Sequence, residues 1–295
     1  MLTTKTRTYY CHVFAVLVVL LPLSVSANEP PDCHHWSSSF DDQGIEGTIE
    51  AAFHPFFSFA TDRDVTRCLT AGASPSSRTE EGWTPLHFAA AFSDYATVIT
   101  LLEAGADLHA RSGTGESPLH LAALNSTLDV TIALLEAGAN VHARGQLGVT
   151  SLHIAASVNK NYRIIYALMK GGSDPNARME DGETPLHVAA MANAEPTVIV
   201  ALLASGSDPL AEDDADETPW DYANDNESLK GTMAYWCLND ARWRAMDGDN
   251  QRMQPLPTSC LMLTGVAEGA SSQTPHIAVG TSDTESQPVG SDVRD

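Results

Sequence analysis

Positive charge is scarce in this sequence. It has 16 Lys and Arg residues against 38 Asp and Glu residues, which gives a formal net charge of −22 at pH 7. A chain this acidic is repelled by the phosphates of nucleic acids and of anionic lipids. We therefore exclude nucleic acid as a partner and expect a protein, one with a basic surface; the alternative is that the charge only keeps the chain soluble.

Long hydrophobic runs are also absent. The most apolar run, Val13 to Leu23, is shorter than the ~20 residues that a membrane-spanning helix needs. Two basic residues precede this run and small residues ending at Ala27 follow it, which is the order of a secretory signal peptide. We predict cleavage after Ala27 and an exported chain, periplasmic or secreted, with no stable membrane insertion. An uncleaved membrane anchor is the alternative.

Cysteine is sparse, with five residues in the whole chain, and no C-x-x-C motif occurs. Thiol redox catalysis and a zinc ribbon therefore lack support. Cleavage removes Cys11 and leaves four cysteines, which can form two disulfides in an oxidising compartment. Proximity in the sequence favours the pairs Cys33–Cys68 and Cys237–Cys260, and buried free thiols are the alternative.

Motifs of catalysis are missing as well. The sequence contains no G-x-S-x-G elbow, no H-E-x-x-H pair and no phosphate-binding loop, so we predict no enzymatic activity and no cofactor. The acidic run 212–217 could bind calcium, but it lacks the spaced glycine of an EF-hand and a solvated loop is the alternative. Cys33, His34 and His35 have no second ligand cluster beside them, and we predict no metal site.

Repetition is what the sequence has in abundance. The segment TPLHFAA, which starts at Thr84, returns as SPLHLAA at Ser117, TSLHIAA at Thr150, TPLHVAA at Thr184 and a degenerate TPWDYA at Thr218; the spacings are 33, 33, 34 and 34 residues. A second motif, LLEAGAD or a variant of it, recurs with the same period before each later copy. Two motifs that recur in phase over four units are a highly specific sign of an internal repeat.

These motifs resemble the ankyrin repeat over residues 47–245. The resemblance implies an all-α fold: an ankyrin-repeat solenoid of stacked helix-turn-helix units with β-hairpin loops, in about six repeats including caps. Thr then caps the first helix, Pro fits its first turn, Leu and Ala form its apolar face, and Gly ends the second helix. In this family the motif histidine hydrogen-bonds between repeats. Here these residues are His87, His120, His153 and His187.

Four segments follow from the position of the array. They are a signal peptide at 1–27, a polar lead-in at 28–46, the ankyrin-repeat domain at 47–245 and a C-terminal segment at 246–295. The last segment should be disordered from about residue 268, because it is too polar to bury a core. The 34-residue spacings place one extra residue in the turn between the two helices of a unit.

Both end units depart from the repeat pattern. The first unit is divergent, and Pro55 is expected to displace or kink its first helix. The last unit is expected to have its second helix at about Glu227 to Arg244. A cap needs a polar outer face, which would be supplied by four residues. These are Lys230, Asn239, Asp240 and Arg242.

The resemblance also implies where a partner docks, namely on the hairpin tips and on the first helices, which line a concave face. The candidate positions are Glu80, Glu81, Trp83, Phe92, Glu116, Leu124, Leu147, Val149, Glu180, Asp181 and Glu183. The first, fourth and fifth tips are acidic and the third is apolar, which suits a partner with a hydrophobic anchor flanked by Lys or Arg. Trp83 and Phe92 are the anchor candidates, and local packing of these two rings is the alternative.

Three functions agree with these features. The first is a protein-protein interaction module of the exported compartment. The second is an inhibitor or immunity protein that blocks an exported toxin or hydrolase, for which an acidic surface suits a basic target. The third is a secreted effector that binds a host protein.

Overall fold

The computed structural model describes Cys33 and residues 60–124, 127–192, 195–246 and 258–261. The predicted signal peptide, the polar lead-in, the first helix of the divergent first unit and most of the C-terminal segment lie outside these residues. Among the residues that are described, no helix is long and apolar enough to cross a membrane.

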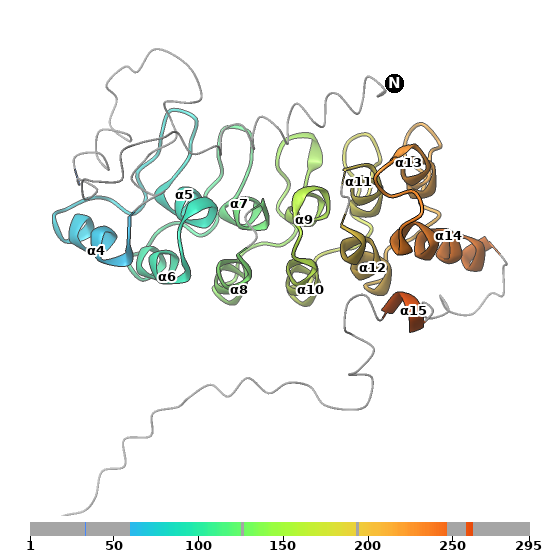
Figure 1. Ribbon diagram of the computed structural model, residues 1–295. Helices are drawn as coiled ribbons and strands as arrows, with labels where there is room; N and C mark the ends of the chain where they lie inside the picture. Colours follow the sequence, from blue (N-terminus) through green and yellow to red (C-terminus); the bar gives the residue numbers. More distant parts are fainter. Residues whose placement is uncertain (1–32, 34–59, 125–126, 193–194, 247–257, 262–295) are drawn as a thin grey trace, which may run out of the picture.

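Short helices stand in two rows, one above the other in Figure 1. The upper row holds the first helices of the units: α5 (Pro85–Phe92), α7 (Pro118–Leu124), α9 (Ser151–Val158), α11 (Pro185–Ala192) and α13 (Pro219–Asp225). The lower row holds the second helices: α4 (Asp62–Thr70), α6 (Tyr95–Glu103), α8 (Leu128–Glu136), α10 (Tyr162–Lys170), α12 (Pro196–Ala204) and α14 (Met233–Met246). Each helix contacts its neighbours in the same row, so the units stack in chain order as the predicted all-α solenoid.

The helices begin and end where the two motifs predict. Thr84 precedes α5 in an extended conformation and Pro85 occupies the first turn, where its missing N–H breaks no bond. At the end of α8, Gly138 adopts a φ of 92°, a left-handed conformation that glycine accepts without strain. The chain then turns back, and the Ala139 N–H donates to the Leu134 carbonyl oxygen at 2.9 Å.

In the first of the two longer repeats, the extra residue lies in the turn between the two helices, as predicted; residues 193 and 194 of the corresponding turn in the next repeat lie outside the described residues. Residues 93–94 separate α5 from α6, whereas residues 159–161 separate α9 from α10. Asn159 in this longer turn is fully buried, and its side-chain amide donates to the Ala123 carbonyl oxygen at 2.9 Å. The longer turn thereby adds a bond to the preceding unit.

The loops between units are hairpin turns. In the first of them, which comprises residues 79–83, the Thr79 N–H donates to the Trp83 carbonyl oxygen at 2.9 Å. No β-strand occurs within the described ranges, so the predicted β-hairpin loops fold as turns without a strand ladder. Neighbouring tips are joined by backbone bonds such as that from the Gly113 N–H to the Glu81 carbonyl oxygen at 2.5 Å.

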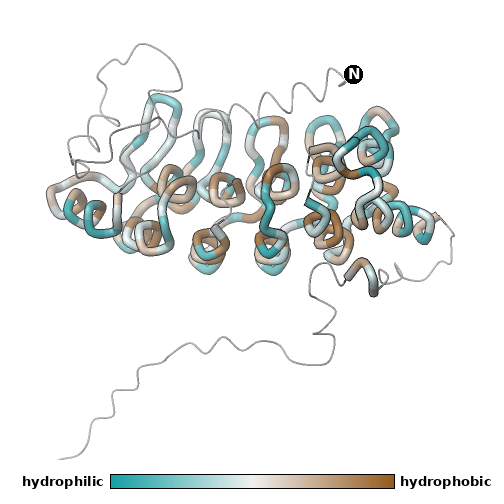
Figure 2. The backbone as a smooth tube through the Cα atoms, viewed as in Figure 1, coloured by the Kyte–Doolittle hydropathy of each residue, from teal (hydrophilic) through white to brown (hydrophobic). Residues whose placement is uncertain are grey.

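The core lies between the two rows. The motif leucines Leu86, Leu119, Leu152 and Leu186 are at most 1% exposed, and the alanine pairs beside them are fully buried. In Figure 2 the lower helices α8 and α10 are brown on the side that faces the upper row and teal on the opposite side. Because alanine is small, the upper helices approach one another closely, and each unit depends on its neighbours to bury its apolar face.

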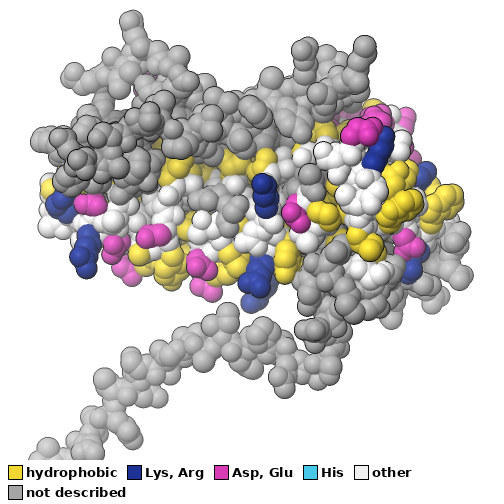
Figure 3. All heavy atoms as spheres, viewed as in Figure 1, with side chains coloured by type: hydrophobic (Ala, Val, Ile, Leu, Met, Phe, Trp, Pro, Cys, Tyr) yellow, Lys and Arg dark blue, Asp and Glu magenta, His cyan; other side chains and the backbone are white. Residues whose placement is uncertain are grey.

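The last unit corrects two expectations. Its second helix, α14, begins at Met233 rather than near Glu227, because the preceding residues form turns that include Gly231 with a φ of 77°. The expected polar outer face is also wrong, since Trp236 and Trp243 on α14 are each 56% exposed. Figure 3 shows apolar side chains gathered over α14 at the right-hand end of the molecule.

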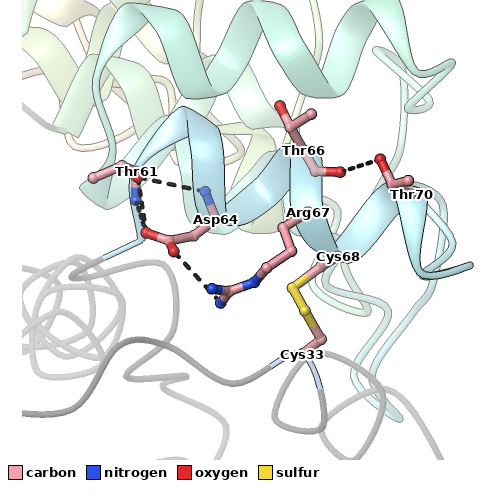
Figure 4. Close-up of a disulfide and its surroundings, with 7 residues drawn as sticks. All are labelled: Cys33, Thr61, Asp64, Thr66, Arg67, Cys68 and Thr70. Carbon is pink, nitrogen blue, oxygen red and sulfur yellow. Dashed lines mark hydrogen bonds and ion pairs between the residues drawn. A yellow bond between two sulfur atoms is a disulfide. The ribbon is translucent and has the colours of Figure 1, made fainter.

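Two disulfides join the pairs that proximity in the sequence favours. The Sγ atoms of Cys33 and Cys68 lie 2.14 Å apart, and those of Cys237 and Cys260 lie 2.07 Å apart. Cys68 is on α4, whose start is capped by Thr61 and Asp64 (Figure 4). The second pair ties the short helix α15 (Thr258–Leu261) to α14. Both ends of the stack therefore carry a covalent link.

Candidate protein-binding site

The motif histidines fix each unit to the next. In the first of these units, His87 Nδ1 accepts from the Thr84 N–H at 3.1 Å, and Nε2 lies 3.0 Å from the Glu116 carbonyl oxygen. A backbone N–H can only donate and a carbonyl oxygen can only accept, so the imidazole is neutral with its proton on Nε2. His120, His153 and His187 repeat this arrangement.

Burial keeps these imidazoles neutral. It lowers the pKa of His87 and of His120 from 6.5 to about 4, and that of His153 to about 3. The pKa of His187 is also lowered by burial. The histidines therefore act as structural links, as the resemblance implies. No group of three or more His, Cys, Asp or Glu side chains among the described residues could hold a metal ion.

A ladder of arginines supports the hairpins. The guanidinium of Arg78 donates to the Arg111 carbonyl oxygen at 3.1 Å, and Arg111 donates in turn to the Arg144 carbonyl oxygen at 3.1 Å. Arg144 bonds to the Arg178 carbonyl oxygen, and Arg178 to that of Glu212. Because each donor reaches one unit ahead, the ladder holds the hairpin tips in a row and fixes their spacing.

The tips display acid mainly at the two ends of this row. Glu80 and Glu81 of the first tip and Glu180 of the fourth tip are exposed, and Asp181 is half-buried. The fifth tip is the most acidic: residues 212–217 hold five carboxylates and no basic residue, and four of the five are exposed while Asp213 is buried. Four of the predicted contact residues thus lie where a partner can reach them.

Two other predicted contact residues are buried, which corrects their expected exposure. Glu116 is 6% exposed, and its carboxylate accepts from the hydroxyls of Ser112, at 2.6 Å, and of Thr114. Glu183 is 2% exposed, and its carboxylate accepts from the Tyr222 hydroxyl at 2.9 Å. Both residues close the base of a hairpin, so their charges stabilise the loop and do not face a partner.

Tyr222 links the fourth and fifth hairpins and was not singled out from the sequence. Its hydroxyl also lies 2.8 Å from Asp213, so it stands between two carboxylates from different units. Burial, and then the charge of Glu183, raise the pKa of Tyr222 and keep its phenol protonated. Burial alone would raise the pKa of Asp213, but bonds from the Glu217 N–H and the Tyr222 hydroxyl hold it below its usual value.

An apolar cluster occupies the middle of the row. It comprises Leu147 and Val149 of the third hairpin, Met179 of the fourth hairpin, and Val188 and Met191 of α11. Val188 is fully buried and Met179 is 5% exposed, whereas the other three side chains are partly exposed above them. We name these five residues the apolar patch. The sequence predicts Leu147 and Val149 here but gives no signal for Met179, because its position in the other hairpins is polar or glycine.

Leu147 has an unusual backbone. Its φ of 56° and ψ of 20° lie in the left-handed region, within a 3₁₀ turn at Gln146–Gly148. For a residue with a branched side chain this conformation costs about 1–2 kcal/mol. Asn or Gly would adopt this conformation with less strain, so leucine at this position makes the turn less stable.

The remaining apolar candidates lie at the edge of the core. Trp83, Phe92 and Leu124 are partly buried and pack against it. The Trp83 ring meets the His87 ring edge-on, with their centroids 5.3 Å apart. Trp83 therefore makes the local packing contact that was the alternative to an anchor role, and only part of its surface is open to a partner.

Sequence models of the ankyrin repeat match the chain in three places. A model of three copies matches residues 56–145, a model of many copies matches residues 134–189, and a model of the single repeat matches residues 181–214. Together these matches run without a gap from residue 56 to residue 214, and they include most of the described helices. No curated protein matches the chain.

Proposed function

The chain belongs to the ankyrin-repeat family, whose members serve as protein-protein interaction modules, and from this premise we propose where and what it binds. The site is the hairpin face, which we define as the hairpin tips together with the outer sides of α5, α7, α9 and α11. Its partner is a protein segment that inserts an apolar side chain at the apolar patch and carries Lys or Arg residues toward the acidic fourth and fifth tips.

One observation carries this proposal: a partly exposed apolar side chain is held in a strained conformation beside a strongly acidic surface. Leu147 has a left-handed backbone, although Asn or Gly at this position would make the turn more stable. Backbone strain of this kind is typical of residues at binding sites. The tips that follow it along the row carry Glu180, Asp181 and the acids of 212–217. Apolar burial then supplies affinity, and opposite charge orients the segment and speeds its association.

The Leu147→Asn variant tests the apolar part. Asn tolerates the left-handed region, so the fold should remain at least as stable while the apolar contact is lost. The probe is a fluorescent peptide of about twelve residues with a central Leu followed by Arg residues, titrated at low salt. We expect the variant to bind at least about tenfold more weakly, which corresponds to about 1.4 kcal/mol.

Charge reversal tests the acidic part. Glu180→Lys with Asp181→Lys should weaken the same probe at low salt and reduce the salt dependence of its affinity. Glu136→Lys is the matched control, because Glu136 is exposed at the end of α8 in the other row of helices. Equal affinities for the parent chain and for both tip variants, with the fold intact, would refute the hairpin face as the site.

We further propose that the chain is exported. The signal-like N-terminus and two cysteine pairs at disulfide distance support this proposal, because such bonds persist in oxidising compartments. The inhibitor and effector alternatives share the hairpin face and differ only in where the partner resides. Mass analysis of the chain recovered from its producing cells should find an N-terminus at Asn28 and four oxidised cysteines; a chain that keeps its first 27 residues and free thiols would contradict export.

A further inference from the structure

The outer face of α14 is the most exposed apolar surface that the structure describes. Five large hydrophobic side chains are exposed among the described residues, and four of them are on this helix. They are Met233 at 46%, Trp236 and Trp243 at 56% each, and Met246 at 47%. The opposite side of the helix, with Ala234, Cys237 and Leu238, is buried against the stack. α14 is therefore apolar on both sides, although it is the last helix of its row among the described residues.

The four exposed large apolar side chains are placed symmetrically along α14. The helix reads MAYWCLNDARWRAM, so Met233 and Trp236 in its first half are matched by Trp243 and Met246 at mirrored distances in its second half. The centre falls between Asn239 and Asp240. A surface that pairs with a second copy of itself through a two-fold axis must be self-complementary, and this symmetric row of Met and Trp side chains has that property on an antiparallel helix pair.

We propose that the chain forms a homodimer in which the outer faces of two α14 helices pack antiparallel about a two-fold axis. Trp236 and Trp243 are seven residues apart, which is two helical turns, so both point to the same side. With the axis between Asn239 and Asp240, Trp236 of each copy lies level with Trp243 of the other. Met233 of each copy likewise lies level with Met246 of the other, and the four indole rings form the centre of the interface.

Charge favours this end of the molecule for self-association. Two copies of a chain with a net charge of −22 repel one another, and any contact between acidic surfaces adds to that repulsion. The helix α14, in contrast, carries two arginines and one aspartate. The Arg242 guanidinium lies 5.8 Å from the Trp243 ring centroid, and Arg244 pairs with Asp240 at 2.7 Å. The charged side chains of α14 thus sum to +1, in contrast to the acidic chain as a whole.

The exposed area agrees with a dimer of modest affinity. A Trp side chain offers up to about 250 Å², so the two Trp residues at 56% exposure contribute roughly 280 Å² per copy. Four such rings, the methionines and the polar border approach the ~1,200 Å² at the lower end of specific interfaces. We therefore expect a dissociation constant of about 1–100 μM in physiological salt, where charge repulsion is screened beyond about 8 Å.

Sedimentation of the purified full-length chain over a range of concentrations tests the dimer. The mass should rise from monomer to dimer, and Trp236→Gln or Trp243→Gln should each weaken the association at least about tenfold. Because both side chains are more than half exposed, the thermal stability of these variants should stay close to that of the parent. A chain that remains monomeric, or a dimer that neither substitution weakens, would overturn the proposal and leave this face to another occupant.

Crosslinking tests the antiparallel register. Met233→Cys and Met246→Cys chains are prepared separately and treated with a bismaleimide of about 10 Å reach, alone and as a mixture. In the proposed pairing, Met233 of one copy lies 13 residues along the helix axis from Met233 of the other, or roughly 20 Å, and the same holds for the two copies of Met246. Met233 of one copy, in contrast, is level with Met246 of the other. The mixture should crosslink and the separate samples should not. Crosslinks within the separate samples would refute the antiparallel pairing. The hairpin face is not involved, so peptide binding there should be unaffected.

Discussion

At the scale of the residue, the motif histidine performs two tasks with its two ring nitrogens. Nδ1 caps the start of its own helix and Nε2 reaches the next unit. The last unit has Asp221 at this position, and its carboxylate still accepts from the Thr218 N–H at 2.8 Å. Aspartate keeps the cap but cannot make the second bond, which would reach the next unit. This agrees with its place in the last unit, since no further hairpin follows within the described residues. The two tasks can therefore be separated by substitution.

The lowered pKa values of His87, His120 and His153 make folding sensitive to mild acid. In the unfolded chain these imidazoles take up protons near pH 6.5. In the folded chain they stay unprotonated down to about pH 4, or about pH 3 for His153. The unfolded state thus binds more protons between these limits, and stability is full above pH 6.5 and falls as the pH falls. Each histidine contributes up to about 1.4 kcal/mol per pH unit in this window.

His120→Asn tests this linkage. Asn preserves a cap for the Ser117 N–H and cannot reach the Val149 carbonyl oxygen, so stability at pH 7 should fall by about 1–3 kcal/mol. The slope of stability against pH between 6.5 and 4.5 should decrease by roughly a quarter to a third, since one of the four histidines whose pKa burial lowers is removed. Denaturant unfolding at several pH values measures both. His142→Asn is the control, because His142 is exposed; an unchanged slope in the His120 variant would disprove the linkage.

At the scale of the element, sequence reasoning succeeds where one residue type satisfies a local requirement. A left-handed turn needs glycine and a first helical turn accepts proline, so the bounds of helices such as α5 and α8 could be predicted from the motifs. The two disulfides could also be predicted, because each partner is the nearest available cysteine. The repeat period then orders the helices into two rows without further information.

Other features depend on contacts between units, which a linear motif does not contain. Glu183 occupies a hairpin like the exposed acids, yet its carboxylate is buried against the Tyr222 hydroxyl of the following unit. Met179 joins the apolar patch because its hairpin is bonded to the third hairpin, where the Leu147 carbonyl oxygen accepts from the Glu180 N–H at 2.9 Å. The exposure of Trp236 and Trp243 could not be predicted, because the sequence places the start of α14 near Glu227 and does not show which side of the helix is buried.

At the scale of the whole molecule, the repeat helices in close contact within the described residues belong to one unit or to adjacent units. Each unit is stabilised by itself and by its immediate neighbours, so a unit at either end has only one neighbour and should open first. The disulfides lie at these ends: Cys68 on α4 and Cys237 on α14. We infer that the cross-links offset the missing neighbour and protect the ends, while the histidine and arginine links connect the units between them.

The Cys237→Ala variant combined with Cys260→Ala tests this division. Its cross-link spans 23 residues, and removing a closure of this length should cost about 3 kcal/mol in the chain-entropy description. Because the loss is local, hydrogen exchange should accelerate in α14 and α12 while the amides of α8 keep their protection. The matched variant, Cys33→Ala with Cys68→Ala, should instead accelerate exchange in α4 and α6. Equal acceleration in every helix would mean that the stack unfolds as a single cooperative unit, and the ends would then have no separate role.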